Sequence, residues 1–129
     1  MLDKKYFSKV KEKLVEFYKF EAKDYISNRT KWIAKMNDLE YKNIKITSAK
    51  TRWGSCSSKK TLNFTFRLIM APTETIDYVI IHELAHLKEM NHSKKFRNLV
   101  EKFAEKIELK NYRIHRKWLK ENGNKLYYV

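Results

Sequence analysis

Two histidines and a glutamate stand in the pattern His-Glu-x-x-His at residues 82–86. Each helical residue advances about 100°, so the imidazoles of His82 and His86 lie about 40° apart on one helix face and can reach a single Zn²⁺. Glu83 lies about 60° beyond His86, where its carboxylate can face a water held by the metal without binding the metal itself. It could take a proton from that water during attack and return it to a leaving group. The pattern therefore predicts metal-assisted hydrolysis of a carbonyl or phosphoryl group.

A catalytic zinc needs a third protein ligand and one open position. His92 follows His86 by six residues, so it reaches the metal only if the helix ends near Asn91 and the chain folds back. The alternative third ligand is a downstream glutamate at position 101, 105 or 108. We prefer His92 because three imidazoles make a compact site that suits zinc. The sequence thus predicts one Zn²⁺ per chain, bound by His82, His86 and His92.

The elements that would position these residues follow from hydrophobic periodicity. Helical spacing from Leu2 to about Leu39 predicts one long helix whose apolar stripe packs on the core. The stripe consists of Tyr6, Val10, Leu14, Phe17, Tyr25, Trp32 and Met36. Alternation between residues 43 and 70 predicts a small, mostly antiparallel sheet of about three strands, in which Gly54 indicates a bulge or a close approach. A helix from about residue 73 to 90 then carries the motif, and two more helices follow, the first capped by Ser93.

Composition limits the function classes. The 129 residues suit one domain, and a single cysteine excludes an internal disulfide. Lys and Arg number 29 against 15 Asp and Glu, a net charge of +14 that would attract nucleic acid or nucleotides. No apolar run is long enough to cross a bilayer, and the first residues lack the apolar core of a signal peptide. We therefore expect a cytoplasmic protein with no membrane or disulfide-linked partner.

Dense motifs surround the histidines. They are Trp-Gly-Ser-Cys at 53–56, Leu-Asn-Phe at 62–64, Arg-Leu-Ile-Met-Ala-Pro at 67–72, Ile-Asp-Tyr-Val at 76–79, His-Glu-Leu-Ala-His-Leu at 82–87, and Asn-His-Ser at 91–93 with Phe96. With them the chain resembles the YgjP-like family of metal-dependent hydrolases from about Tyr18 to Asn122. The resemblance implies a zincin-like α+β fold over residues 1–129, with His82, His86 and His92 as zinc ligands and Glu83 as acid and base. WLM and SprT-like peptidases, which act on proteins crosslinked to DNA, look like more distant relatives. Family members usually carry a β-rich segment before the long helix, for which these 129 residues have no counterpart.

The resemblance implies more than one activity. Most members are described as metallopeptidases, which act on peptide or protein substrates, and some as UTP pyrophosphatases, which act on nucleotides. A third possibility is a nucleic-acid-associated protein with secondary protease activity, because the surface is basic. The expected function is a zinc metallopeptidase, and a peptide substrate would distinguish it from the two alternatives.

Four residues on the predicted strands are further candidates for substrate binding: Trp53, Ser55, Asn63 and Arg67. An edge strand beside the metal could pair with an extended peptide. Arg67 could stabilise an oxyanion or grip a phosphate, or it could form an ion pair that supports the fold. Cys56 is expected to pack in the interior rather than to bind metal. We interpret His115 as structural or exposed.

Overall fold

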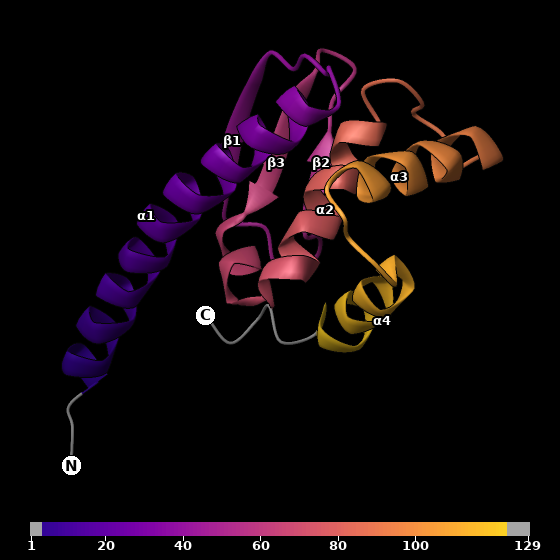
Figure 1. Ribbon diagram of the computed structural model, residues 1–129. Coiled ribbons are helices and arrows are strands. Elements are labelled where there is room, and N and C mark those ends of the chain that lie inside the picture. Colours follow the sequence, from indigo (N-terminus) through magenta and orange to yellow (C-terminus); the bar gives the residue numbers. More distant parts are fainter. Residues whose placement is uncertain (1–3, 124–129) are drawn as a thin grey trace.

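The computed structural model describes residues 4–123, which form an α+β fold. In chain order the elements are α1 (Lys4–Met36), β1 (Asn43–Thr47), β2 (Gly54–Cys56), β3 (Thr61–Thr65), the 3₁₀-helix η1 (Phe66–Met70), α2 (Thr73–Ala85), α3 (Lys94–Lys106) and α4 (Tyr112–Asn122). α1 crosses the molecule diagonally, and α2 separates the sheet from α3 and α4 (Figure 1). The expected long first helix, small sheet, motif helix and two C-terminal helices are all confirmed. Within residues 4–123 no helix combines the length and the apolar character needed to cross a membrane.

The strands form a mixed sheet of order β1-β3-β2. β2 pairs antiparallel with β3, with Gly54 opposite Phe64, whereas β1 pairs parallel with β3, with Ile44 opposite Leu62. The prediction of a mostly antiparallel sheet therefore holds for the β2–β3 hairpin but not for β1. After β1, the connection over residues 48–53 leads to β2, which does not pair with β1. β3 then lies between the two strands and pairs with both. Because the chain reverses twice, β3 runs in the same direction as β1.

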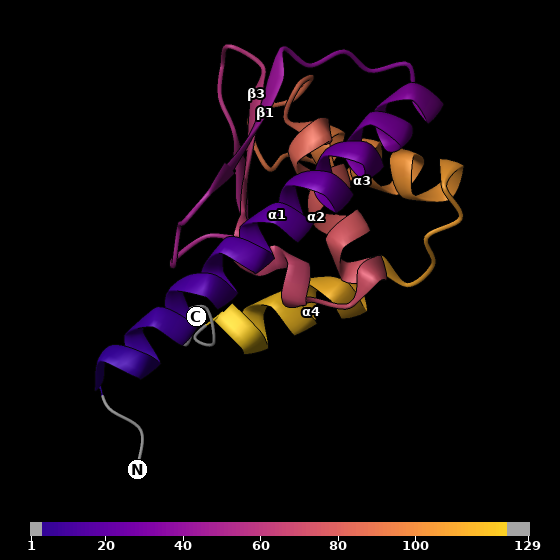
Figure 2. The same cartoon turned by 90° about the vertical axis from the view of Figure 1, so that its left-hand side faces the viewer.

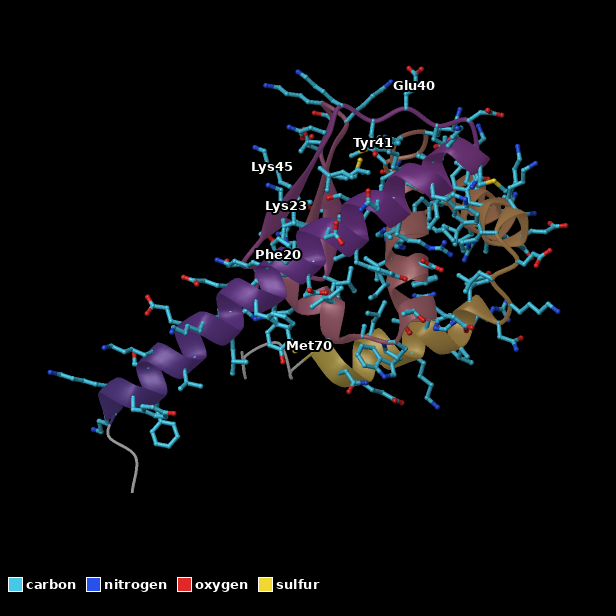
Figure 3. The ribbon with its side chains drawn as sticks, turned by 60° about the vertical axis from the view of Figure 1, so that its left-hand side comes forward. Phe20, Lys23, Glu40, Tyr41, Lys45 and Met70 are labelled. Atoms are coloured by element: carbon cyan, nitrogen blue, oxygen red, sulfur yellow. The ribbon has the colours of Figure 1, made fainter. Side chains whose placement is uncertain are left out.

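α1 packs on the molecule mainly through its second half, and Val15 and Tyr18 of the first half are partly buried against the core. Its buried residues are Ala22, Ile26, Thr30, Ile33 and Ala34. These are small or β-branched side chains that let the helix lie close to η1 and α2. Most of the first half extends beyond the rest of the fold (Figures 1 and 3).

The predicted core stripe of α1 is wrong for most of its residues. Tyr6, Phe17 and Trp32 are 53%, 56% and 42% exposed, and Val10, Leu14 and Met36 are exposed as well. Periodicity marks one face of a helix but does not say which part of that face meets another element. The face that is buried carries the smaller residues instead.

α2 is the central helix of the fold. It contacts α1, β2, α3 and α4, so most of its circumference is buried, including Ile76, Ile80, Ile81 and Leu84. In the view of Figure 2 the sheet stands on one side and the helices on the other, so α2 fills the interior of a two-layer arrangement. This position fixes the direction of every side chain that α2 carries.

Two polar contacts fix the N-terminal half of α2. The Arg29 guanidinium donates to both carboxylate oxygens of Asp77, from Nε at 2.8 Å and from Nη2 at 2.9 Å. Arg29 also lies 4.4 Å above the Trp32 ring, a cation–π contact. On the other side, the Thr75 hydroxyl lies 2.9 Å from Nδ1 of His115 on α4. His115 is buried at this contact, which confirms its structural role.

Candidate metal centre

α2 ends at Ala85, earlier than the predicted end near Met90. The amides of His86, Leu87 and Lys88 donate to carbonyls three residues back, at 3.0–3.2 Å, so the last turn tightens. Among the described residues Asn91 has no positive φ, so the helix does not end in a left-handed residue there. The early end lets the chain fold back and bring residue 92 toward the helix.

Ser93 starts the next helix as predicted. Its Oγ accepts a hydrogen bond from the Phe96 amide at 3.3 Å, which satisfies one of the free donors at the start of α3. Because the cap fixes the direction of α3, it also fixes His92, the residue immediately before it. Ser93 alone, directly after His92, was therefore enough to predict where the next helix begins.

Three imidazoles converge at the end of α2. His82 and His86 project from the helix, and His92 reaches them from the loop before α3. One ring nitrogen from each lies within 4.8 Å of the others. The ring centroids are 4.9–5.2 Å apart in all three pairs. The structure therefore brings together the three residues that the sequence singled out as ligands.

The hydrogen bonds of His86 suit a metal ligand. Its Nδ1 lies 3.0 Å from the Glu89 carbonyl oxygen, which can only accept, so Nδ1 carries the proton and donates. In the neutral ring Nε2 then has a free lone pair, and it points at Nε2 of His92, 3.1 Å away. Two such nitrogens need a proton or a cation between them, and tetrahedral zinc places its ligand nitrogens about 3.3 Å apart. The donor set and its geometry fit Zn²⁺.

Burial favours the neutral form of His82 and of His86. Burial, followed by the charges of His86, His92 and Arg116, lowers the pKa of His82 to about 4. The pKa of His86 is also lowered, mainly by burial. Neutral imidazole is the form that binds a metal, so His82 remains competent well into the acid range.

Phe96 supports all three rings. Its centroid lies 4.9 Å from His82, 4.4 Å from His86 and 5.0 Å from His92, and it is 4% exposed. In the sequence Phe96 was noted only as part of the motif that includes His92, with no part in the site. Its position one helical turn after His92 was the signal that could have indicated this contact.

Glu83 lies beside the histidines and is 6% exposed. A Cβ atom at Gly54 would stand 3.2 Å from Cγ of Glu83 and 3.1 Å from the Asn63 carbonyl oxygen. The close approach predicted at Gly54 is therefore confirmed, since only glycine lets β2 lie so near this side chain. Burial raises the pKa of Glu83 to about 8, and the charge of Arg52 offsets part of that rise.

Two adjoining cavities open at the histidines. One, of about 320 Å³, is lined by Arg52, Trp53, Gly54, Tyr78, Val79, His82, Glu83, Arg116 and Leu119. The other, of about 510 Å³, is lined by Tyr78, His82, His92, Phe96, Arg97, Val100, Tyr112, Arg113 and Arg116. Tyr78, His82 and Arg116 line both cavities. One extended molecule could therefore contact Glu83 and the histidines at the same time.

The sequence analysis missed several of these lining residues. Tyr78 precedes His82 by one helical turn, so helical spacing could have identified it. Arg52 and Arg116 carried no such signal, because their places depend on how the loop before β2 and α4 pack on α2.

The four candidate substrate-binding residues lie in different surroundings. Trp53 lines the smaller cavity, and its Nε1 donates to the Leu119 carbonyl at 3.3 Å. Asn63 donates to the Ser55 hydroxyl at 3.3 Å across the β2–β3 pair, on the sheet face opposite Gly54. Arg67 is buried and donates to the Ser48 carbonyl at 2.9 Å, outside both cavities. Of the four, only Trp53 lies in the wall that also holds Glu83.

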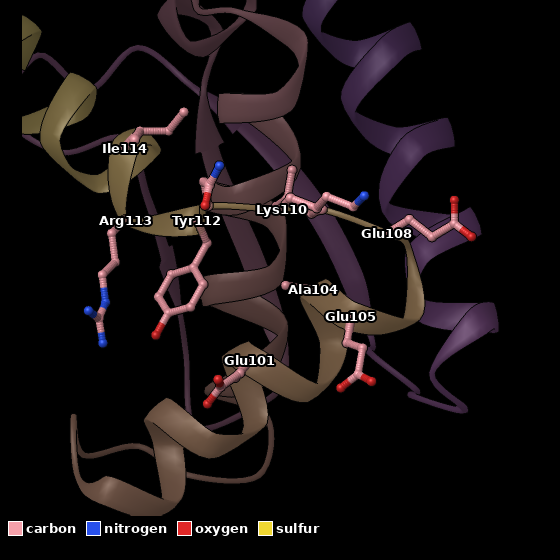
Figure 4. Close-up of a pocket in the computed structure, with 10 residues that line it drawn as sticks. Glu101, Ala104, Glu105, Glu108, Lys110, Tyr112, Arg113 and Ile114 are labelled. Atoms are coloured by element: carbon pink, nitrogen blue, oxygen red, sulfur yellow. The ribbon is translucent and has the colours of Figure 1, made fainter.

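The alternative third ligands lie elsewhere. Glu101, Glu105 and Glu108 line a neighbouring groove of about 770 Å³ between α3 and the start of α4, which shares Tyr112 and Arg113 with the larger cavity beside the histidines (Figure 4). Within residues 4–123, the histidine trio is the one group of candidate donor side chains close enough to hold a metal together. Cys56 is not part of it, and burial raises the pKa of its thiol to about 11, which suits a packing role.

Comparisons with known proteins agree with this geometry. The structure is similar to the crystal structure of the metallopeptidase zymogen abylysin of Pyrococcus abyssi, with a TM-score of 0.56 and 25% sequence identity, over 71% of this chain and 93% of that one. No curated protein matches the chain. The family described as "YgjP-like, metallopeptidase domain" matches residues 2–122. A chain matched over nearly its whole length by that description belongs to the YgjP-like family of metallopeptidase domains.

Proposed function

We propose that this metallopeptidase domain is a zinc-dependent peptidase in which Glu83 is the general acid and base. The observation that carries the proposal is the convergence of His82, His86 and His92 beside the buried carboxylate of Glu83. In the described part of the chain this carboxylate forms no ion pair. Family membership and the likeness to a metallopeptidase zymogen support peptide hydrolysis. Neither comparison points to a nucleotide or a nucleic acid.

His82, His86 and His92 would hold the metal, and Phe96 and the Glu89 carbonyl would keep the rings in place. Bound there, Zn²⁺ would supply Lewis acidity, which makes water easier to deprotonate and a carbonyl easier to attack. The neutral state of His82 favours this binding because no proton has to leave first.

Glu83 would move the protons. Its carboxylate accepts one from the attacking water and donates it to the nitrogen of the leaving amine. Burial raises the pKa of Glu83 to about 8 in the metal-free chain, so its carboxylate is more basic than an exposed one, and a bound cation would favour the ionised form that accepts the proton. Gly54 keeps β2 against the stem of this side chain, so the carboxylate has little freedom to turn away.

β2 would position the substrate. It is an edge strand of the sheet and carries Gly54, which lies against Glu83. An extended peptide could pair with the free edge of β2 and pass the carboxylate, with Trp53 in the adjoining wall. Main-chain pairing of this kind would hold peptides of different sequence, which suits a peptidase.

Metal analysis combined with three variants tests the proposal. We expect about one zinc per chain in the wild type and in Glu83→Gln, loss of peptide cleavage in Glu83→Gln, and loss of zinc in His92→Ala. Glu105→Gln removes an exposed carboxylate that lines neither cavity beside the histidines, so this matched control should keep both zinc and cleavage. Normal cleavage by Glu83→Gln would refute the role of Glu83, and full zinc affinity in His92→Ala would refute the ligand set. Hydrolysis of UTP but of no peptide would favour the pyrophosphatase alternative.

A further inference from the structure

The larger of the two cavities beside the histidines is lined by three arginines. Arg97 projects into it from α3, and Arg113 and Arg116 from α4. The other lining residues are Tyr78, His82, His92, Phe96, Val100 and Tyr112, so within residues 4–123 no carboxylate lines the space. Tyr112 and Arg113 also line the neighbouring groove that holds Glu101 (Figure 4). We call the space with the three arginines the arginine cavity. It combines three cations with two of the three histidines of the metal centre.

In the described part of the chain these arginines have no carboxylate partner. Among residues 4–123 the contacts between basic side chains and carboxylates join Arg29 to Asp77, His115 to Glu74 and Lys117 to Glu121, and none includes an arginine of the cavity. Arg113 and Arg116 are three residues apart on one face of α4, and Arg97 faces them from another helix. The folded chain therefore gathers three unpaired guanidinium groups at one place.

We propose that the arginine cavity is a subsite for a carboxylate of the peptide substrate, close to the bond that is cleaved. This inference rests on the proposed function and adds a substrate preference to it. A guanidinium group presents parallel N–H donors that match the two oxygens of a carboxylate. Tyr78 and Tyr112, stacked at 6.2 Å with their planes 7° apart, supply an apolar wall for the methylene groups that precede it.

The carboxylate could come from two sources. An acidic side chain next to the scissile bond would make the protein selective for internal Asp or Glu. The C-terminal carboxylate of the substrate would make it selective for bonds near the end of a peptide. Both present the same group to the arginines, so the experiment has to separate them.

Binding and cleavage of four matched peptides test the subsite. The peptides share one sequence, with Glu or Gln beside the central bond and with a C-terminal carboxylate or amide. Affinity is measured by fluorescence anisotropy on the zinc-loaded full chain carrying Glu83→Gln, and cleavage is measured on the wild type. We expect the preferred carboxylate to tighten binding about tenfold, the size of one partly exposed charge-assisted hydrogen bond. Adding Arg113→Gln or Arg97→Gln should remove most of that preference, whereas Lys120→Gln, an exposed charge on the same helix, should leave it unchanged.

The outcomes separate this inference from the proposed function. Dependence on Glu identifies the side-chain source, and dependence on the free C-terminus identifies the terminal source. Equal affinity and equal cleavage for all four peptides would overturn the subsite while leaving the peptidase intact. Failure to cleave any peptide, with a carboxylate preference that still needs Arg113, would support the subsite and overturn the peptidase. Arginine-dependent binding of inorganic pyrophosphate that is tighter than binding of every peptide would reassign the cavity to phosphate. Zinc content, measured for each variant, shows whether the neighbouring centre is intact.

Discussion

Replacing Glu83 with Gln should stabilise the metal-free protein while it abolishes hydrolysis. Glu83 is 6% exposed, and burial raises its pKa from an ordinary 4.5 to about 8. The folded chain without metal therefore resists ionisation of this group, whereas the unfolded chain does not. Gln has nearly the same shape and carries no charge, so it avoids the penalty.

The sign and size of the effect follow from the two pKa values. Between pH 4.5 and about 8 the folded state holds a proton on Glu83 that the unfolded state has released. The free energy of unfolding therefore falls as the pH rises through this window and levels off above it. At 1.36 kcal/mol per unit, the loss is about 3 kcal/mol at pH 7 and about 5 kcal/mol above pH 8. For a domain of this size that is a large share of the whole stability.

Urea unfolding in the presence of a chelator measures the effect. We expect the midpoint for Glu83→Gln to exceed that of the wild type by an amount equivalent to about 1 kcal/mol at pH 5 and at least 3 kcal/mol at pH 8. Glu105→Gln removes an exposed carboxylate and should show no such pH dependence. A difference between Glu83→Gln and wild type that is the same at both pH values would refute the reasoning. Added Zn²⁺ should shrink the difference, because a nearby cation favours ionised Glu83.

Two further substitutions test the supports of the site. Gly54→Ala would place Cβ 3.1 Å from a carbonyl oxygen of β3 and 3.2 Å from Cγ of Glu83, so we expect a loss of about 1–3 kcal/mol and slower cleavage with zinc retained. Gly123→Ala, which meets nothing within 4 Å, should change neither property, and equal behaviour of the two variants would contradict the close approach. Asp77→Asn breaks the pair with Arg29 that joins α1 to α2, and thermal unfolding should show a loss of about 2 kcal/mol. An unchanged melting temperature would mean that apolar packing alone attaches α1.

The metal centre was predictable because its signals are local. The spacing of His82 and His86 fixes one helix face, and the Ser93 cap fixes the direction of the chain just after His92. Gly54 stood out inside a strand pattern, where a missing side chain indicates a near neighbour. Each of these inferences depends on residues only a few positions apart.

What failed depended on contacts between distant segments. The large apolar residues of α1 form a regular stripe, yet Ala22 and Ile26 are buried because η1 and α2 lie on their side. The parallel pairing of β1 with β3 depends on where β3 inserts, which no alternation of residues specifies. Arg116 reaches His82 only through the packing of α4 on α2. In each case the helix or strand was predicted correctly, but the element that packs against it was not.

The central position of α2 explains how the fold tolerates an unfavourable site. Burial of Glu83 opposes folding of the metal-free chain by several kcal/mol at pH 8, yet the same helix buries Ile76, Ile80, Ile81 and Leu84. Each such side chain contributes about 1.5–3 kcal/mol, so together they outweigh the penalty. Glu83 cannot become fully hydrated by moving alone, because its helix is packed on several sides and β2 lies against its stem. The apolar surroundings that stabilise α2 are therefore the same ones that raise the basicity of Glu83. A substitution that exposed Glu83 to water would lower its basicity and would also remove apolar packing from α2.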